Sequence, residues 1–339
     1  MQHHLSRIAA VGVLAAAPLT GLSAQGLSSP QCAGGSGGSI ALVAQDACQQ
    51  AYDVYQLLAP QLGLALTGGN ATAGQGGVLG GLGHFSVGVR VNGFGGLTPN
   101  TSGNGYPVST TGAQQRTLPT KTMFFGLPTA DAAIGLYKGF PLALTNILGV
   151  DALVSAEYVP TITQSDFSLT PSSNFKFGYG ARIGLLSESI AFPGVSFTWI
   201  ERDLPTMDIK TSSNNNGAST TLGINNMDVE THAWRIVASK SLIAFSVAAG
   251  IGRDGYKQSA TIEGTVSQGG AAGSQTVPLT QTMNRTNMFG DFAINLPALK
   301  LVFEVGDAMG GAVATYNSFT GGRADRSQLY GSFGLRLSR

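Results

Sequence analysis

The sequence has little charge and few reactive side chains. Only 11% of its 339 residues are charged, against roughly 25% in an ordinary soluble domain. The 19 basic and 18 acidic side chains nearly cancel, so net charge gives no reason to expect a nucleic-acid partner. Two cysteines and four histidines are present, and their spacing does not match a structural zinc site. We therefore expect neither a metal nor a nucleic acid.

Long apolar runs and cofactor fingerprints are also missing. Beyond the N-terminal leader, no stretch reaches the roughly 17–25 residues that a transmembrane helix needs. This argues against a helical membrane protein. No phosphate-binding loop or dinucleotide-binding fingerprint follows a strand pattern. We expect no cofactor and no enzymatic activity.

Two short motifs keep a hydrolase open as an alternative. His84 and Ser86 form a His-x-Ser pair that resembles the nucleophile region of outer-membrane lipid hydrolases. Asp228, Glu230 and His232 resemble the carboxylate–histidine pair of the ten-stranded outer-membrane proteases. The closely spaced Asp pair that those proteases carry on another strand is absent here.

The N-terminus is typical of an export signal. Arg7 precedes an apolar run of about eleven residues, small residues follow, and no acidic residue appears before Asp46. Cleavage after Ala24 is expected, with cleavage after Gly26 as the alternative. A transmembrane anchor is the other interpretation, but the run is short for one.

The two cysteines, Cys32 and Cys48, follow soon after the leader. In an oxidising compartment they could form one disulfide. Two free thiols are the alternative.

One amphipathic helix is expected before the strands begin. Residues 28–39 are rich in Gly, Ser and Pro and predict a linker. Apolar side chains then recur at helical spacing over residues 41–58, and Pro60 and Gly63 predict the end of that helix. The Gly-rich residues 68–77 predict a flexible bridge. Such a helix must bury its apolar stripe, either inside a barrel or at its mouth.

The rest of the chain alternates between apolar and polar side chains. In the clearest segment, Phe175, Phe177 and Tyr179 share one face, and Lys176 and Gly178 share the other. We expect ten strands of this kind, over residues 84–94, 131–140, 150–163, 174–186, 195–204, 227–239, 242–257, 286–295, 299–309 and 329–339.

The connections between these segments alternate between long and short, which is the rule for outer-membrane barrels. Lipid cannot satisfy free backbone groups, so the last strand must pair with the first, near residues 85–91. The sequence therefore predicts an all-β fold, a transmembrane antiparallel up-and-down β-barrel of about ten strands (range roughly 10–14). A soluble β-sandwich or propeller is the alternative. The expected division is a signal peptide over residues 1–24, a periplasmic linker and helical plug or cap over 25–79, and the barrel over 80–339.

If the apolar faces meet lipid, the polar faces line the lumen. Both signs of charge occur there, which predicts either a salt-bridged interior that holds a narrow barrel together or a polar path for a solute. The candidate lumen-lining residues are Arg90, Asp131, Glu157, Lys176, Arg182, Arg235, Asp291, Glu304 and Arg336.

The chain also resembles an uncharacterised family of predicted outer-membrane barrels, loosely similar to the long-chain fatty-acid transporter class. The resemblance lies in the leader, the Cys-bearing helix ending in Leu-Leu-Ala-Pro-Gln-Leu-Gly at residues 57–63, and two segments. These are Gly-Gly-Leu-Gly-His-Phe-Ser-Val-Gly-Val-Arg at residues 80–90 and Gly-Val-Asp-Ala-Leu-Val-Ser at residues 149–155. The Asn-Pro-Ala motif of that class is missing.

The resemblance implies a protein of the outer membrane that transports small molecules, hydrophobic ones among them. A structural or surface-display barrel acting through its long extracellular loops is the alternative. The implied partners are outer-membrane lipid, the barrel-assembly machinery and a small-molecule solute of unknown identity.

Overall fold

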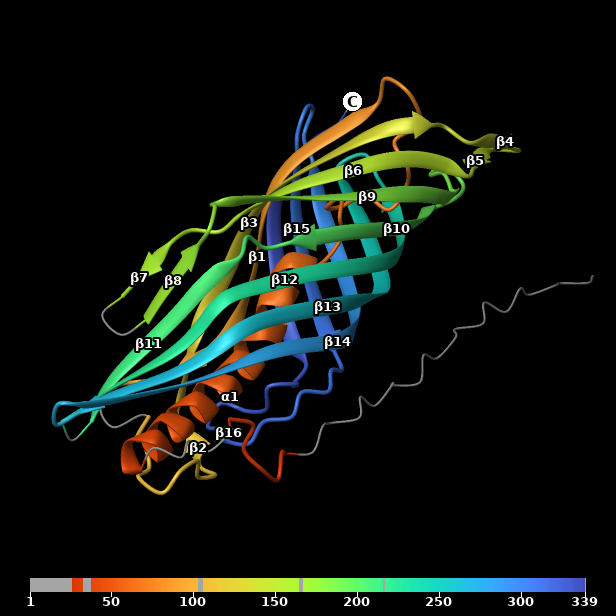
Figure 1. Ribbon diagram of the computed structural model, residues 1–339. Coiled ribbons are helices and arrows are strands. Elements are labelled where there is room, and N and C mark those ends of the chain that lie inside the picture. Colours follow the sequence, from red (N-terminus) through yellow and green to blue (C-terminus); the bar gives the residue numbers. More distant parts are fainter. Residues whose placement is uncertain (1–25, 33–37, 103–105, 165–166, 216, 339) are drawn as a thin grey trace, which may run out of the picture.

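A computed structural model describes residues 26–32, 38–102, 106–164, 167–215 and 217–338. The predicted signal peptide, residues 1–24, and part of the expected linker, residues 33–37, lie outside the described residues. In the described part, ten strands close into a barrel around one helix (Figure 1). None of the described helices is both long and apolar enough to cross a membrane.

Every neighbouring pair of the ten strands is antiparallel. β17 closes the ring by pairing with β1, from Ser86 opposite Ser338 to Gly93 opposite Gly331. The predictions of an all-β barrel and of pairing between its first and last strands are confirmed. The ring consists of β1 (Phe85–Pro99), β3 (Thr120–Tyr137), β6 (Gly149–Tyr158), β9 (Phe175–Leu186), β10 (Gly194–Asp203), β12 (Ala218–Ser241), β13 (Phe245–Gln268), β14 (Ala271–Asn295), β15 (Lys300–Met309) and β17 (Gln328–Ser338).

Short strands decorate this ring. Three of them extend the sheet from one side of β12, namely β11 (Met207–Asn215), β8 (Phe167–Pro171) and β7 (Ile162–Thr163). The others are the hairpin of β4 (Phe140–Leu142) with β5 (Thr145–Ile147), and the parallel pair of β2 (Thr117–Leu118) with β16 (Ser318–Phe319).

The two ends of the barrel differ. At one, the turn end, short connections join β12 to β13 and β14 to β15. At the other, the hairpin end, β13 and β14 run far past the ring and meet at Gly269–Gly270. Both glycines have positive φ, +58° and +84°, which is the requirement of a two-residue type I′ hairpin.

An apolar belt surrounds the turn-end half of the barrel. Outward side chains there are exposed and apolar on all ten strands or at their ends, as a lipid-facing surface requires. Members of the belt are Phe85, Val87, Val89, Ile134, Val154, Phe177, Trp199, Trp234, Ile236, Val247, Ile251, Met288, Phe292, Phe303, Val305, Phe333 and Leu337.

Where the strands leave this belt, the outer face of the sheet changes from apolar to polar, and the inner face changes from polar to apolar. On β14, outward Met288, Phe292 and Ile294 are apolar, whereas outward Thr282 and Asn284 are polar. The apolar side chains of that distal part, such as Val277, Leu279 and Met283, point inward instead. The strand keeps its geometry, so only the phase of the pattern changes. We call this distal part of the strands the extension.

The extension corrects the expectation of long loops. Residues 258–285 were expected to be a connection, yet they continue β13 and β14 in unbroken register from Phe245–Ile294 to Gln268–Ala271. β12 likewise begins at Ala218 and β3 at Thr120, well before the predicted segments. A strand whose apolar phase shifts by one residue loses the simple alternation that the sequence reading relied on.

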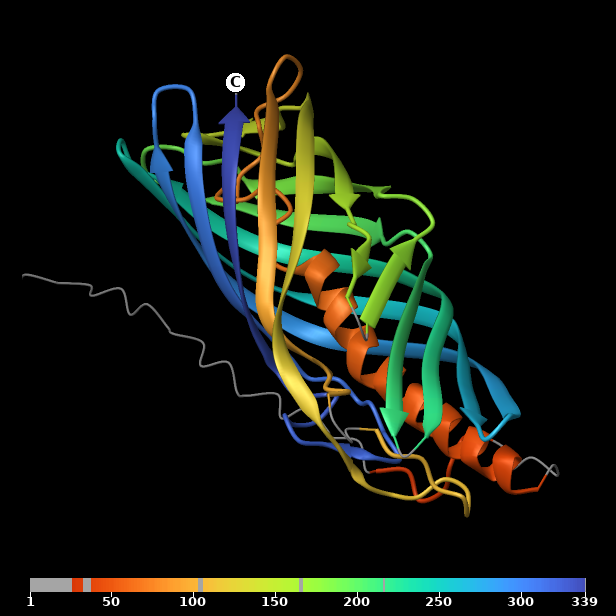
Figure 2. The same ribbon diagram turned by 90° about the vertical axis from the view of Figure 1, so that its left-hand side faces the viewer.

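The helix α1 (Ser39–Thr67) is longer than the predicted 41–58 and lies inside the barrel (Figure 2). Pro60, expected to end it, sits within it. Gly63 is also helical, and a Cβ there would lie 2.7 Å from the ring of Tyr256. Its lack of a side chain therefore lets the helix pass the wall. Packing against the barrel outweighs the helix-breaking tendency of both residues.

The helix enters from the hairpin end. Its first half lies against the extension, where Gly264 approaches Cys48, and its last residue reaches Asp254 near the belt. The expected flexible bridge, residues 68–77, then runs on through the lumen toward the turn end and is almost entirely buried. The wall, rather than the Gly-rich composition, fixes its path.

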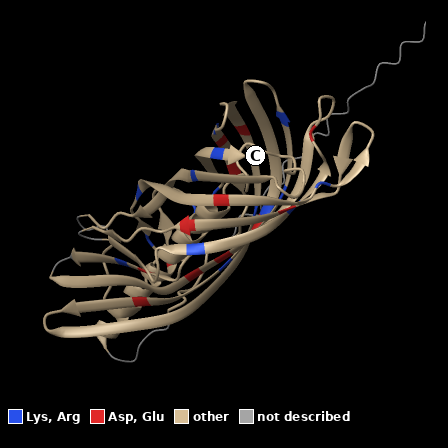
Figure 3. Cartoon of the chain, turned by 90° about the horizontal axis from the view of Figure 1, so that it is seen from above, with Lys and Arg blue, Asp and Glu red and all other residues tan. Residues whose placement is uncertain are grey.

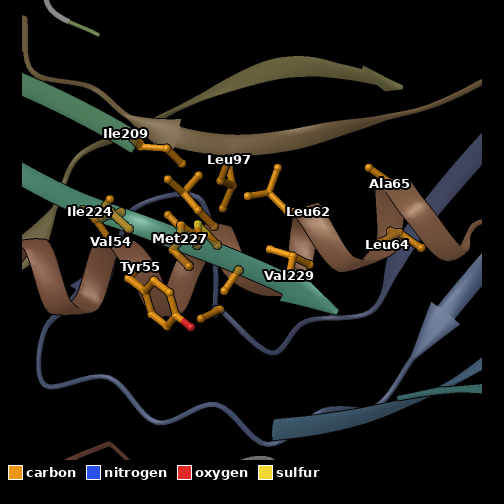
Figure 4. Close-up of a cluster of buried hydrophobic side chains, with 14 of the residues drawn as sticks. Val54, Tyr55, Leu62, Leu64, Ala65, Leu97, Ile209, Ile224, Met227 and Val229 are labelled. Atoms are coloured by element: carbon orange, nitrogen blue, oxygen red, sulfur yellow. The ribbon is translucent and has the colours of Figure 1, made fainter. Parts of the chain in front are cut away.

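An apolar core fills the extension between helix and sheet. Val54, Leu62 and Ala65 of α1 meet Ile224 and Val229 of β12 there (Figure 4). Both faces of this core come from segments far apart in the chain, so helix and extension stabilise each other.

Replacement of Gly264 should push α1 away from the extension. A Cβ at position 264 would lie 2.1 Å from the backbone N of Cys48, whereas one at Gly223 meets nothing closer than 3.4 Å. We expect G264A to lower stability by about 1–3 kcal/mol through overpacking and G223A to leave it unchanged. The measurement is the temperature at which each barrel loses its fast-migrating form on a denaturing gel. Equal temperatures for the two variants would contradict the close contact.

Candidate functional site

The alternation of buried and exposed positions puts the candidate lumen residues on the inner face of the ring. Basic and acidic residues are interspersed along the strands (Figure 3). Asp131 and Lys176 are partly exposed, and the other seven are buried. Those seven are Arg90, Glu157, Arg182, Arg235, Asp291, Glu304 and Arg336.

Ion pairs join many of these residues and three that sequence reasoning left out, Asp151, Arg202 and Asp254. Arg202 lies two residues after Ile200 and four after Thr198, on the same inward face of the strand. Strict alternation along the sequence could therefore have identified it as a lumen residue. Asp254 follows the inward Gly250 and Gly252 just where the phase changes, which hid it. The pairs are Arg90–Asp131 at 2.7 Å, Arg202–Asp131 at 3.0 Å, Arg202–Glu157 at 3.3 Å, Arg182–Asp151 at 2.7 Å and Arg235–Asp254 at 2.5 Å.

Three wall arginines bind the C-terminus of α1. The helix has no basic residue in its own last turn, so its free carbonyl groups and the negative end of its dipole need outside partners. Guanidinium groups of the wall supply them. Arg202 donates to the Leu66 carbonyl at 3.2 Å, Arg235 to that of Thr67 at 2.7 Å, and Arg90 to that of Gly68 at 3.1 Å.

Wall carboxylates bind the segment after the helix in the complementary way. This segment, residues 68–79, forms no regular structure. Apart from a few local bonds, such as that from the Gln75 N–H to the Thr72 carbonyl at 3.0 Å, its N–H groups need partners outside it. Three acids accept from them. Glu304 accepts from the N–H of Asn70 at 2.8 Å, Asp291 from that of Gly74 at 3.0 Å, and Asp151 from that of Leu79 at 3.2 Å. We call α1 and residues 68–79 together the plug.

The plug fills the lumen. Beside Thr72, Ser86 and Arg90 lies a cavity of about 20 Å³, room for about one water molecule. Among the described residues the charged wall thus binds a backbone rather than lining an open path.

Carboxylates of the helix hold the hairpin end closed. Asp46 accepts from the N–H of Ser109 at 2.7 Å and pairs with Arg116 at 2.9 Å. Asp53 accepts from the N–H groups of Tyr316 at 2.9 Å and Asn317 at 3.0 Å. Burial raises the pKa of Asp46, and it raises the pKa of Asp53 to about 6, against the lowering effect of these hydrogen bonds. The loop that carries Ser109 and the loop that carries Tyr316 are therefore both bound to α1.

Cys32 and Cys48 form a disulfide at the start of the plug. It ties the segment before α1 to the helix, and the Gln49 side chain accepts from the Cys32 N–H at 3.2 Å. The described N-terminal segment is thereby fixed at the hairpin end.

Among the described residues the wall lacks ladder pairing at two places beyond the belt. At the first, β14 over 271–285 pairs only with β13, and β1 over 94–99 pairs only with β3. The second lies between β3 and β7. Residues 150–163 were expected to be one strand, but β6 ends at Tyr158, where Pro160 follows. From there β3 (over 120–128) pairs only with β1, and β7 pairs only with β8, among the described residues. Two strand edges thus face each other without ladder hydrogen bonds. Such edges cannot lie in hydrocarbon, which agrees with a position outside the belt.

This opening is apolar and leads to the plug. Its cavity measures about 130 Å³. On the outer surface an apolar groove of about 340 Å³ lies beside it, lined by Pro128, Tyr158 and Phe175 among others. Pro128 adjoins Leu127 and Tyr158 adjoins Val159 in the chain, so groove and cavity are neighbours. The cavity is lined by Leu62, Ala65, Met123, Phe125, Leu127, Val159, Ile162, Phe167, Leu169, Leu204 and Met207.

The hydrolase motifs do not come together as a site. His84 is exposed at the turn end, and Ser86 is buried. His232 is exposed on the outside of β12, and Glu230 there pairs with Lys257 at 3.1 Å. In the described part of the chain, no three His, Cys, Asp or Glu residues cluster as metal ligands would.

Comparison with known proteins gives only distant matches. No family model matches the chain, and no curated protein matches it. The transport unit of the autotransporter AIDA-I from Escherichia coli is 9% identical over 86% of this chain and 99% of that chain, with a TM-score of 0.30. The β domain of the Bordetella autotransporter BrkA is 9% identical over 75% and 98%, with a TM-score of 0.26.

An anion-selective porin from Comamonas acidovorans is 11% identical over 76% of this chain and 98% of that one, with a TM-score of 0.17. These neighbours are outer-membrane β-barrels. None of the three is a fatty-acid transporter, so they give no support to that resemblance.

Loss of one wall arginine should loosen the plug. Replacing Arg235 by Gln leaves Asp254 buried with its ion pair removed and frees the Thr67 carbonyl. We expect a loss of about 3–5 kcal/mol in stability and more frequent channel openings in planar bilayers. The matched variant K257Q breaks a pair whose side chains are 64% and 48% exposed, which should change stability by less than about 1 kcal/mol. Equal effects of both variants would count against the wall as the plug's anchor.

Proposed function

We propose that the chain is an outer-membrane barrel that transports small apolar molecules. The apolar belt supports a membrane location, because an exposed ring of aliphatic and aromatic side chains suits lipid and not water. The short turns would face the periplasm and the extension would stand outside the cell, following the usual orientation of such barrels. Lipid and the barrel-assembly machinery are then its expected partners.

The observation that carries the proposal is the apolar opening between β3 and β7. Its cavity reaches Leu62 and Ala65 of the plug, and neither carries a polar side chain. A polar solute would lose its hydration there without gaining partners. An apolar molecule that arrives along the outer groove would lose nothing. The filled lumen means that passage toward the periplasm requires residues 68–79 to shift.

The role proposed for the lumen charges is to hold that plug. No catalytic step is proposed, and no residue of the wall is assigned one. The hydrolase alternative lacks an assembled set of groups, since His84 and Ser86 differ in exposure and His232 faces outward.

A second candidate function, surface display, is favoured by the extension. Its outer face on β14 is rich in hydroxyl groups, with Ser274, Thr276, Thr280 and Thr282 exposed, and it would stand clear of lipid. A barrel that acts through this face would not need the wall opening. The two functions therefore differ in what a blocked opening does.

Filling the opening should stop transport. Ala65 lines the cavity, so A65F places a ring in it, whereas Ala238 lies on the lipid face of β12 and A238F only enlarges the belt. We expect cells that carry A65F to take up the apolar fluorophore N-phenylnaphthylamine no faster than cells without the protein. Cells that carry A238F should match the wild type.

Equal amounts of folded barrel are verified by gel mobility before boiling. Undiminished uptake by folded A65F would contradict the proposed route and leave surface display as the better explanation.

A further inference from the structure

A second cavity lies at the turn end, at the opposite end of the plug from the extension. It measures about 200 Å³ and is lined by plug residues and by the strand ends around them. Gly77, His84, Glu188, Ser241, Lys300 and Arg336 are among its lining residues. Transport as proposed above moves the plug residues that line this cavity but assigns no ligand to it.

Two cations face each other across its wall. Lys300 and Arg336 are directly opposite in the β15–β17 register, and both stand on the inner face. Directly opposed residues of neighbouring strands hold their Cβ atoms about 4.5–5.5 Å apart, and like charges in that position repel. Arg182, by contrast, is paired with the acid Asp151.

The hydrogen-bond acceptors of these two cations are neutral groups. Lys300 reaches the Ser246 hydroxyl at 3.4 Å, and Arg336 donates from Nη1 to the Ala73 carbonyl at 2.5 Å. Arg336 is only 5% exposed, and its Nε–H has no hydrogen-bond partner among the described residues. A buried guanidinium N–H without an acceptor is costly.

The nearby acids Asp291 and Glu188 form no ion pair with either cation among the described residues, although Oδ1 of Asp291 has no hydrogen-bond partner there. Asp291 accepts through Oδ2 from Gly74 at 3.0 Å and from the Asn70 amide at 3.1 Å. Glu188 accepts from the N–H of Ser241 at 2.5 Å. Glu188 also lines the cavity, and its negative charge would repel an anion that carries more than a small charge.

From these observations we infer an anion site between Lys300 and Arg336. It binds one compact anionic group, a carboxylate or a phosphate, that accepts from the Arg336 guanidinium and the Lys300 ammonium. Charge-assisted bonds of this kind are the strong ones. The group could belong to a free solute in the periplasm or to the head group of a lipid in the inner leaflet.

The test is binding of inorganic phosphate and of acetate to the purified full-length protein by titration calorimetry, at constant ionic strength in chloride. Wild type should bind at least one of them saturably. K300M and R336M should each bind it at least about tenfold more weakly, since one charge-assisted bond is worth roughly that factor. K300R keeps the charge and should stay within about threefold of wild type.

The matched control is K176M, which removes a lysine on the inner face of β9 that does not line this cavity. Gel mobility before boiling verifies that each variant is folded. Absence of saturable binding by folded wild type overturns the site, and so does equal weakening by K176M, which would indicate a general charge effect.

The source of the anion is distinguished in vesicles. Phosphate binding that persists in phosphatidylcholine but disappears in vesicles containing phosphatidylglycerol indicates a lipid head group, and equal binding in both indicates a free solute. None of these measurements involves uptake of an apolar molecule, so failure of the transport proposal would leave the result unaffected.

Discussion

The need of every backbone N–H and C=O group for a partner governs this molecule from outside to inside. In the belt, lipid offers no hydrogen bonds, so ten strands close on one another and β17 returns to β1. In the lumen, residues 66–79 lie where water has little room, and charged side chains of the wall take its place. Arg90, Arg202 and Arg235 serve carbonyl groups, whereas acids serve N–H groups. In the described part of the chain the ring opens beyond the belt, and one of these openings lies between β3 and β7.

One continuous sheet faces lipid in the belt and water in the extension, so its two faces change character along the strands. Within the belt the sheet is apolar outside and charged inside, and in the extension it is polar outside and apolar inside. The helix α1 matches this change, because its apolar side chains between Val43 and Leu66 pack in the core, while its C-terminal carbonyl groups and the segment after it meet the charged lumen. Helix and barrel wall therefore fit in one position along the barrel axis. A shifted helix would bring apolar side chains to the arginines and carbonyl groups to the core.

The same inversion explains what sequence could and could not predict. Strands within the belt follow one phase over their whole length, as residues 174–186 do, and their number, order and inward charges could be read directly. The extension could not, because on β14 the apolar residues move from even to odd positions near Thr286. Pro60 and Gly63 are ordinary helix-ending signals in an isolated segment, and only the surrounding wall overrides them. The wall opening and the Lys300–Arg336 pair depend on register, which a single sequence does not specify.

Lipid contact along β14 distinguishes a strand whose outer face changes from apolar to polar from one whose outer face is apolar throughout. Both native cysteines are bonded to each other, so single cysteines at the outward positions 276, 280, 282, 284, 288 and 292 can carry a fluorophore. In vesicles with a quencher on the lipid chains, we expect strong quenching at 288 and 292 and none from 276 to 284. Quenching that continues unchanged to position 276, or that is absent at 288 and 292, would contradict the change of the outer face from apolar to polar.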